Sequence, residues 1–328
     1  MSRVAVVFTG GTISMRVDAA AGGNVPALDG AALLSLVPGL GRIAEVVPID
    51  RGLTPASHFT FEQLFGIADT VGEALADPAI DGAVVVQGTD TIEETAFFFD
   101  LLHRSEKPVI VTGAMRSASE PGYEGPANLA DAVAAAASAA LRGQGCLVVL
   151  AGSIEPADDV RKTHASAITT FASPNLGPLG HVVAGRVVVA RLRAGRRSVR
   201  ATRAGEPVFL VTATVASDGS IVRATRPLGP AGYVIEATGA GNTNPDLLAA
   251  CVEAMDAGVP VVMTTRTPAG RAGTGYAFPG GGATWARAGA LFAGYLDGPK
   301  ARIALALGVG AGLDRDGLAR LLDDPAPS

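Results

Sequence analysis

The sequence predicts an α/β protein with two α/β domains, a larger N-terminal one with a mainly parallel sheet flanked by helices and a smaller C-terminal one with a parallel sheet. Short apolar runs alternate with longer helical stretches, which is typical of βα units in a parallel sheet. The 48% hydrophobic and 5% aromatic content reflects Ala and Val, which suit parallel strands buried beneath helices. The length of 328 residues fits two domains better than one.

The N-terminal domain is predicted from six apolar runs separated by helical stretches. Asp90, followed three residues later by Glu93, predicts a capping box at the start of the second helix. Gly143 predicts the end of the third. The predicted strands are 4–8, 43–49, 82–87, 108–113, 146–151 and 187–192, and the predicted helices are 61–75, 91–104 and 128–142.

Apolar periodicity stops at residues 192–206, which predicts a linker between domains 1–191 and 207–328. Because the net charge is -5, the arginines of this segment indicate a solvated face rather than a nucleic-acid site. The C-terminal predictions are strands 208–214, 233–237 and 259–265 and helices 246–257, 289–297 and 300–307.

Composition and motif spacing exclude several classes of protein. The net charge of -5 argues against nucleic-acid binding. No apolar run reaches the roughly 18–20 residues of a membrane span, and Ser2 and Arg3 lead into the first strand without a signal sequence, so we expect a cytoplasmic protein with no membrane contact. Cys146, Cys251 and the four histidines show no metal-ligand spacing, which predicts reduced thiols, no metal site and no cofactor.

Two predicted strands end in hydroxyl-bearing turns. Thr9-Gly10-Gly11-Thr12 follows residues 4–8, and Gly88-Thr89-Asp90 follows residues 82–87. Open α/β sheets place reactive side chains at the carboxyl ends of their strands, so these turns predict a site built around a threonine nucleophile. The alternative is that both are structural turns, with Thr12 and Asp90 as caps.

Charged residues near these turns add further candidates. Asp90, at a helix N-terminus, could hold the ammonium of an amino acid while the helix N–H groups hold its carboxylate. Lys162 closes the run Asp158-Asp159-Val160-Arg161-Lys162 and is one of only three lysines. A lysine near a threonine hydroxyl can act as a base, whereas the alternative interpretation of this run is a surface charge cluster.

Taken together, these segments resemble the bacterial-type L-asparaginase/glutaminase family over nearly the whole chain. Any one match is weak, but six in the same order are specific. The matching segments are 9–13, 88–96, 107–116, 159–163 with 171–180, 239–244 and 300–302.

The resemblance implies hydrolysis of the side-chain amide of L-asparagine to L-aspartate and ammonia through a threonine acyl-enzyme. It assigns Thr12 as the nucleophile and Thr89, Asp90 and Lys162 as a second catalytic group that handles protons. It further implies a homotetramer or homodimer without a cofactor, in which Asn244 reaches a neighbouring subunit's site. The substrate-binding residues by the same resemblance are Gly11, Ser57, His58, Gly88, Ala114 and Asn244.

The chain departs from the family pattern in three places. The loop 15–28 lacks the tyrosine that pairs with the nucleophile, with Val25 near its position and Tyr276 as a candidate substitute. Either Ala56 or Ser57 takes the place of the serine that binds the substrate carboxylate, and the acidic residue expected in 266–276 has no match. L-glutamine or D-asparagine therefore stay open as substrates.

Two other functions remain as alternatives to amide hydrolysis. One is a non-catalytic amino-acid-binding protein on the same scaffold, against which the presence of all four candidate catalytic residues argues. The other is a nucleotide-binding dehydrogenase, which lacks the expected glycine fingerprint after the first strand.

Overall fold

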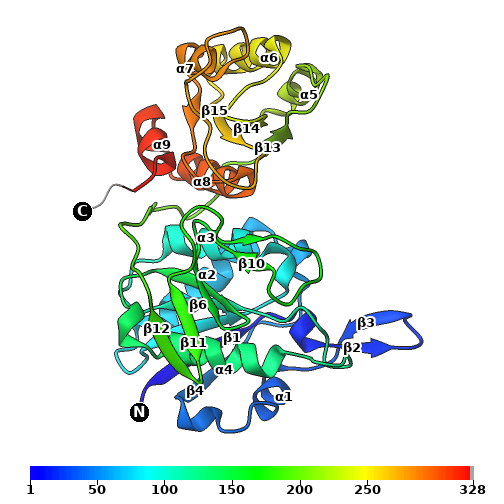
Figure 1. Ribbon diagram of the computed structural model, residues 1–328, viewed down its shortest axis with the longest axis vertical. Coiled ribbons are helices and arrows are strands. Elements are labelled where there is room, and N and C mark those ends of the chain that lie inside the picture. The colour runs from blue at the N-terminus through cyan, green and yellow to red at the C-terminus, as the bar shows by residue number, and fades with distance from the viewer. Residues whose placement is uncertain (326–328) are drawn as a thin grey trace. The chain divides into compact units, whose positions relative to one another are not determined.

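The computed structural model describes residues 1–325 and confirms the predicted fold class (Figure 1). It divides into two compact units, Met1–Arg196 and the chain from Arg197 onward. The first contains a large, mostly parallel sheet, and the second a smaller parallel sheet.

Unit 1 is built on an eight-stranded sheet in the order β12-β11-β8-β7-β6-β5-β1-β4. The strands from β4 to β7 in this order run parallel, whereas β8, β11 and β12 pair antiparallel. The strands are β1 (Arg3–Phe8), β4 (Glu45–Asp50), β5 (Gly82–Val86), β6 (Val109–Thr112), β7 (Cys146–Leu150), β8 (Ser153–Pro156), β11 (Gly180–Val183) and β12 (Arg186–Val189). Two hairpins lie outside the sheet, β2 (Met15–Asp18) with β3 (Gly23–Pro26) and β9 (Arg161–Lys162) with β10 (Phe171–Ala172).

Helices cover both faces of the large sheet. Val4, Val6 and Phe8 of β1 share a core with residues of α1 and α4, while α2 and α3 contact β1, β5, β6 and β7 on the other face. The central strands are therefore buried on both sides and read as unbroken apolar runs. The helices are α1 (Gly30–Ser35), α2 (Phe61–Ala76), α3 (Ile92–Leu102) and α4 (Gly125–Ala136), with 3₁₀ turns η1 (Thr12–Ser14), η2 (Leu40–Arg42), η3 (Ala56–His58), η4 (Thr89–Thr91) and η5 (Ala139–Leu141).

Two predictions for unit 1 are corrected. The helix expected at 128–142 begins earlier, at Gly125, because Pro126 occupies its first turn, and it ends at Ala136 before a separate 3₁₀ turn and Gly143. The segment 15–28, predicted as a loop, instead contains β2 and β3, which form an antiparallel hairpin that projects from the rest of unit 1 (Figure 1).

Unit 2 is a four-stranded sheet in the order β13-β14-β15-β16, and all three pairings are parallel. Residues of α5, α6 and α7 share one core with the sheet, and α8 contacts β13, β14 and β15. The strands are β13 (Val208–Thr212), β14 (Gly232–Ala237), β15 (Val261–Thr265) and β16 (Leu291–Phe292). The helices are α5 (Ser220–Thr225), η6 (Arg226–Leu228), α6 (Pro245–Asp256), α7 (Gly282–Ala288), α8 (Gly298–Gly310) and α9 (Arg315–Leu322).

The helix expected at 289–297 is wrong. Gly289 ends α7 with a φ of 97°, and Leu291–Phe292 forms β16, which pairs parallel with Val262 and Met263 of β15. Gly294 has a φ of 57°. Glycines with positive φ on both sides of this apolar stretch favour a short strand over a helix.

The expected solvated face at 192–206 is also wrong for three of its arginines, one of which, Arg197, is 6% exposed and bonds Asp324 at 2.8 Å. Arg193 and Arg196 bond the carboxylate of Asp100, at 2.8 and 3.1 Å, and the side chains of Arg193 and Asp100 are only 4% and 0% exposed. Burial alone would raise the pKa of Asp100, but the two arginines hold it below its usual value. Arg193 and Arg196 therefore pack against Asp100 of α3 instead of facing solvent.

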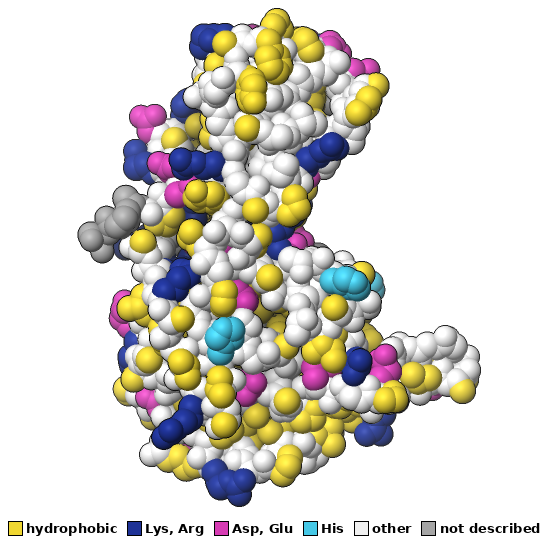
Figure 2. Space-filling model, viewed as in Figure 1, with side chains coloured by type: hydrophobic (Ala, Val, Ile, Leu, Met, Phe, Trp, Pro, Cys, Tyr) yellow, Lys and Arg dark blue, Asp and Glu magenta, His cyan; other side chains and the backbone are white. Residues whose placement is uncertain are grey.

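The prediction of two buried, unpaired cysteines is confirmed. Cys146 and Cys251 are free, buried thiols, and burial raises the pKa of Cys251 to about 12. Within residues 1–325, no helix combines the length and apolar character needed to cross a membrane. On the face drawn in Figure 2, acidic and basic side chains are interspersed and not gathered by sign.

Candidate active site

The carboxyl ends of β1 and β5 meet at two glycines. The strands are neighbours in register, Phe8 beside Val86, and Thr9 Oγ1 donates to the Val86 carbonyl at 3.0 Å. Gly11 follows with a φ of +96°, and a Cβ there would lie 2.2 Å from the backbone nitrogen of Gly88. Only glycine permits this conformation and this approach, so the two strand ends pack backbone against backbone.

Each of these glycines precedes a threonine that opens a 3₁₀ turn. Thr12 is the first residue of η1 after Gly11, and Thr89 is the first residue of η4 after Gly88. The first N–H groups of a helical turn have no partner inside it. Thr12 is partly exposed, whereas Thr89 is 4% exposed. The structure thus brings together two hydroxyls and a group of backbone donors at one edge of the sheet.

Lys162 reaches this edge from the β9–β10 hairpin. Its Nζ donates to Thr89 Oγ1 at 3.1 Å and to Asp90 Oδ1 at 2.9 Å. The Lys162 side chain is 15% exposed and that of Asp90 is 70% exposed. Among the predicted catalytic residues, Thr89, Asp90 and Lys162 are therefore in direct contact, and Lys162 is not part of a merely solvated charge run.

The capping box predicted from Asp90 and Glu93 is wrong. The N-cap of α3 is Thr91, which makes no side-chain capping bond, and Asp90 lies in η4 and binds Lys162. Glu93 accepts the backbone N–H of Lys162. Both carboxylates bind Lys162 of the β9–β10 hairpin, which is about 70 residues away in sequence. The spacing of residues around Asp90 does not indicate such a contact.

The segment after β4 contributes η3. Ala56 is 4% exposed and lies against Gly88, where a Cβ would approach the Ala56 Cβ to 3.0 Å. Thr91 Oγ1 donates to the Ala56 carbonyl at 3.2 Å. Ser57 and His58 follow in the same turn and are exposed. Ala56 is thus the residue of this turn that packs against the strand ends.

Ala114 lies after β6 and is fully buried. The preceding Gly113 is beside Thr89, since a Cβ there would lie 3.2 Å from Thr89 Cγ2. The Gly113 carbonyl accepts a hydrogen bond from Asn128 Nδ2 at 3.0 Å, which ties this strand end to α4.

Two candidates belong to unit 2. Asn244 is the N-cap of α6, and its Oδ1 accepts the N–H of Asp246 at 2.8 Å. Tyr276 is 48% exposed, and its ring lies 5.8 Å from that of Phe278, centroid to centroid. The partners of both residues in these contacts belong to unit 2.

Tyr123 was not among the predicted site residues, but it contacts the segment that follows Thr12. Its hydroxyl donates to the Ile13 carbonyl at 2.7 Å. Its place three residues before Pro126 indicates a helix start nearby but does not indicate the contact with Ile13.

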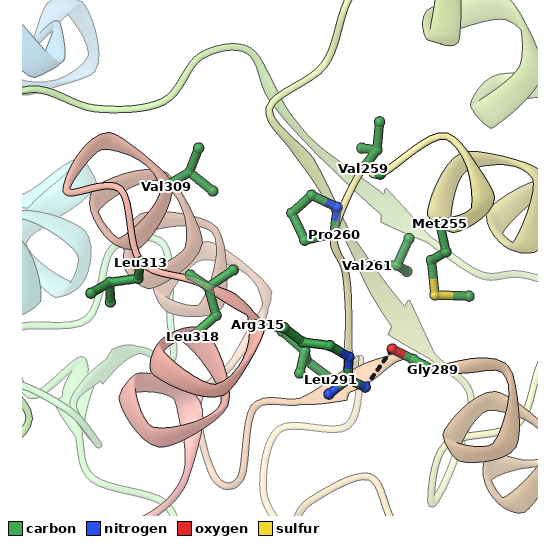
Figure 3. Close-up of a pocket in the computed structure, with 11 residues that line it drawn as sticks. Met255, Val259, Pro260, Val261, Gly289, Leu291, Val309, Leu313, Arg315 and Leu318 are labelled. Atoms are coloured by element: carbon green, nitrogen blue, oxygen red, sulfur yellow. Dashed lines mark hydrogen bonds between the residues drawn. The ribbon is translucent and has the colours of Figure 1, made fainter.

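Unit 2 holds a separate cavity of about 380 Å³ (Figure 3). Its lining is mostly apolar, and Arg315, at its edge, donates to the Gly289 carbonyl at 2.8 Å. None of the predicted site residues lines it. The lining residues are Met255, Gly258, Val259, Pro260, Val261, Gly289, Leu291, Val309, Leu313, Arg315 and Leu318.

The site in unit 1 has the parts of an acyl-transfer centre. It combines threonine hydroxyls, a lysine amine within hydrogen-bond distance of one of them, and backbone N–H groups at two turns. Within residues 1–325, no three His, Cys, Asp or Glu side chains are grouped so that they could hold a metal ion.

Comparisons with known proteins agree over both units. Residues 3–194 match the family described as "Asparaginase, N-terminal", and residues 207–322 match "Glutaminase/Asparaginase C-terminal domain". An L-asparaginase of Bacillus licheniformis is 33% identical over 308 residues, covering 93% of this chain and 94% of that protein. A probable L-asparaginase of Deinococcus radiodurans is 36% identical over 332 residues, covering 98% and 97%.

A solved structure resembles the whole chain. The crystal structure of a probable cytoplasmic L-asparaginase from Campylobacter jejuni superposes with a TM-score of 0.87 at 27% sequence identity. The match covers 98% of this chain and 99% of that one, so it includes both units.

Proposed function

The chain belongs to the asparaginase family and is an asparaginase-type amidohydrolase; on that premise we propose that it hydrolyses L-asparagine to L-aspartate and ammonia through an acyl-enzyme on Thr12. The observation that carries the proposal is the contact of Lys162 Nζ with Thr89 Oγ1 and Asp90, beside the strand end that bears Thr12. The proposal needs no cofactor.

In the first half of the reaction the Thr12 hydroxyl oxygen bonds to the amide carbon and gives up its proton. The amide nitrogen receives a proton as its bond to carbon breaks, and ammonia leaves an ester on Thr12. We assign the N–H groups at the starts of η1 and η4 to stabilisation of the negative oxygen that forms during the attack. The loss of such an interaction typically costs about 10²–10³ in kcat.

In the second half, water adds to the ester and the Thr12 oxygen leaves with a proton. Thr89, hydrogen-bonded to Lys162, is the group we assign to proton transfer in both halves. Asp90 accepts a hydrogen bond from Lys162 and is exposed enough to meet the substrate ammonium. Lys162 and Asp90 thus link proton transfer to substrate orientation.

On the substrate side we assign Gly11, Gly88 and Ala114 to the pocket wall, because Gly11 and Gly88 precede the two threonines and Ala114 follows Gly113, which lies beside Thr89. Ala56 packs against Gly88 and carries no hydroxyl, so we assign the contact with the substrate carboxylate to Ser57 and His58, the exposed residues of the same turn. His58→Ala should then raise KM more than it lowers kcat.

The substrate assignment has an alternative supported by a specific observation. The family matched by unit 2 is described as "Glutaminase/Asparaginase C-terminal domain", so L-glutamine is a second candidate, and D-asparagine remains a third. We further propose a cytoplasmic homotetramer or homodimer in which Asn244 reaches a neighbouring subunit's site. The cytoplasmic assignment is supported by the likeness to the probable cytoplasmic L-asparaginase of Campylobacter jejuni.

The test is ammonia release from purified protein with L-asparagine, L-glutamine and D-asparagine in parallel. Thr12→Ala should abolish release while the protein stays folded, and Thr12→Ser should retain part of it. Thr70→Ala is the matched control, because it removes a threonine hydroxyl that bonds only its own helix, at the Gly66 carbonyl. Rapid-quench mass spectrometry should find an aspartyl group on the Thr12 peptide.

Each outcome of this test decides a separate part of the proposal. Turnover by Thr12→Ala would remove Thr12 from the mechanism. Release from L-glutamine alone would correct the substrate. No release from any of the three would mean that the pocket serves another amide or that the scaffold only binds amino acids.

A further inference from the structure

The loop between β6 and α4 is bonded to the stretch that follows Thr12 at every second residue. The Ile13 carbonyl accepts from the Tyr123 hydroxyl at 2.7 Å, the Met15 carbonyl accepts from Ala118 N at 3.0 Å, and Val17 N donates to Ser119 Oγ at 3.1 Å. The loop therefore runs alongside η1 and the first strand of the projecting hairpin. These three bonds anchor that strand to the loop.

Tyr123 makes the contact nearest to Thr12. Its ring lies over the start of α4, because a Cβ at Gly125 would fall 2.3 Å from the hydroxyl oxygen. The next residue, Glu124, accepts the N–H groups of Met115 and Arg116 just after Ala114. The tyrosine is thus held between the strand end beside Thr89 and the turn that carries Thr12.

The turn η1 is fixed more firmly at its end than at its start. Ser14 is buried, and its carbonyl accepts the backbone N–H groups of residues 27 and 28, both at 2.9 Å. Gly10 and Gly11 precede Thr12 with φ values of 103° and 96°, where glycine adds conformational freedom. A rotation of the backbone between Thr12 and Ser14 would swing the Thr12 hydroxyl, and the Tyr123 bond to the Ile13 carbonyl opposes that rotation.

We propose that Tyr123 is a positioning residue that fixes the Ile13 carbonyl and thereby aims the Thr12 hydroxyl at the scissile amide. The inference rests on the proposed function, in which Thr12 is the nucleophile. The assignment is to positioning and not to proton abstraction, because the hydroxyl is donated to a carbonyl. Residues 15–28 contain no tyrosine, so this anchor of the nucleophile turn comes from a different loop.

The raised pKa of Tyr123 is consistent with a hydroxyl that donates its proton in a hydrogen bond. Burial, assisted by the Glu124 carboxylate and opposed by Arg16, raises the pKa of Tyr123 to about 12. The hydroxyl therefore keeps its proton throughout the neutral and mildly alkaline range, in which the bond to Ile13 persists.

The first variant is Tyr123→Phe, which removes only the hydroxyl. We expect kcat to fall by about tenfold, as for the loss of one well-placed hydrogen bond that holds a reacting group, with KM changed by less than about twofold. Amide hydrogen exchange at Ser14 should become faster. The matched control is Tyr233→Phe in unit 2, whose hydroxyl also donates to a backbone carbonyl, Val222, at 3.1 Å. It should retain wild-type kcat.

A second variant, Gly125→Ala, displaces the ring without removing any hydrogen-bonding group. Alanine is the better helix former, so weaker helix propensity cannot explain a loss of rate. Ser119→Ala removes the bond to Val17, five residues from Thr12, and should lower kcat less than Tyr123→Phe does. A graded effect along the strand is what anchoring predicts.

The results separate this inference from the proposed function. If Thr12→Ala is inactive and Tyr123→Phe keeps wild-type kcat, positioning by Tyr123 is wrong and the nucleophile stands. If Tyr123→Phe and Tyr233→Phe lower kcat equally, the effect is general destabilisation and the inference is again wrong. If Thr12→Ala remains active, the nucleophile is wrong, and the positioning role as stated falls with it.

Discussion

Replacing Lys162 by methionine separates a catalytic lysine from a surface charge. Methionine keeps most of the side-chain length but removes the amine that lies 3.1 Å from Thr89 Oγ1 and 2.9 Å from Asp90 Oδ1. The backbone N–H of Lys162, which Glu93 accepts, is unchanged. The hairpin that carries residue 162 should therefore stay in place.

A catalytic lysine and a surface charge predict different losses of kcat and of stability for Lys162→Met. A positioned acid or base contributes about 10²–10⁴ to the rate, so kcat should fall at least a hundredfold at every pH at which the wild type works. The free energy of unfolding should change little, because Asp90 is 70% exposed and such pairs contribute less than about 1 kcal/mol. Ammonia release and urea denaturation measure the two quantities.

Lys107→Met is the matched control. Lys107 Nζ donates to the carbonyls of Leu75 and Asp77 at 2.8 and 2.7 Å, so this variant also removes a lysine with two contacts in the same unit. It should lose up to about 1 kcal/mol of stability and keep kcat. If Lys162→Met retains a third or more of wild-type kcat, the assignment of Lys162 to proton transfer is refuted.

Two further predictions concern stability. Asp100→Asn removes the buried carboxylate that Arg193 and Arg196 share, and leaves Arg193 with Asp158 as its carboxylate partner, at 2.9 Å. It should cost about 3–5 kcal/mol at neutral pH in urea denaturation. Pairing with the arginines lowers the pKa of Asp100 in the folded state. The stabilisation by Asp100 is therefore complete above the unfolded pKa of about 3.9 and is lost as the pH falls through the folded pKa. The difference in unfolding free energy between variant and wild type should shrink at acid pH, and a constant difference would contradict this. Gly11→Ala should cost more than about 2 kcal/mol and abolish activity, whereas Gly22→Ala, with a φ of +70° and open space, is its control for strain alone.

The central strands of the large sheet were predictable because they are buried on both faces, whereas β8 and β11 were missed. Residues 4–8 and 82–87 read as continuous apolar runs between turns, and the structure has β1 and β5 there. The prediction of a helix at 289–297 failed, because Leu291 and Phe292 form β16 at the edge of the unit 2 sheet. The β2–β3 hairpin was also missed, and its residues are mostly exposed and carry little pattern.

The candidate site was predictable where it depends on strand ends. Threonines and glycines directly after adjacent parallel strands must meet, and Thr12 and Thr89 open two such turns. The use of Glu93 and Tyr123 was not predictable, because each contacts a residue 69 or 110 positions away through a backbone group. A side chain that bonds a distant carbonyl or N–H leaves no spacing in the sequence.

The residues assigned to amide cleavage and those assigned to substrate binding differ in how tightly the fold packs them. The groups assigned to breaking the amide follow β1 and β5, where Gly11 and Gly88 pack at a distance that admits no side chain. The groups assigned to the substrate backbone, Ser57 and His58, are exposed and lie in a three-residue turn. On this assignment, substitutions of Ser57 or His58 should alter which amide binds without disturbing the strand ends. The proposed mechanism therefore depends on the packing of β1 against β5, whereas the proposed choice among L-asparagine, L-glutamine and D-asparagine depends on two exposed side chains.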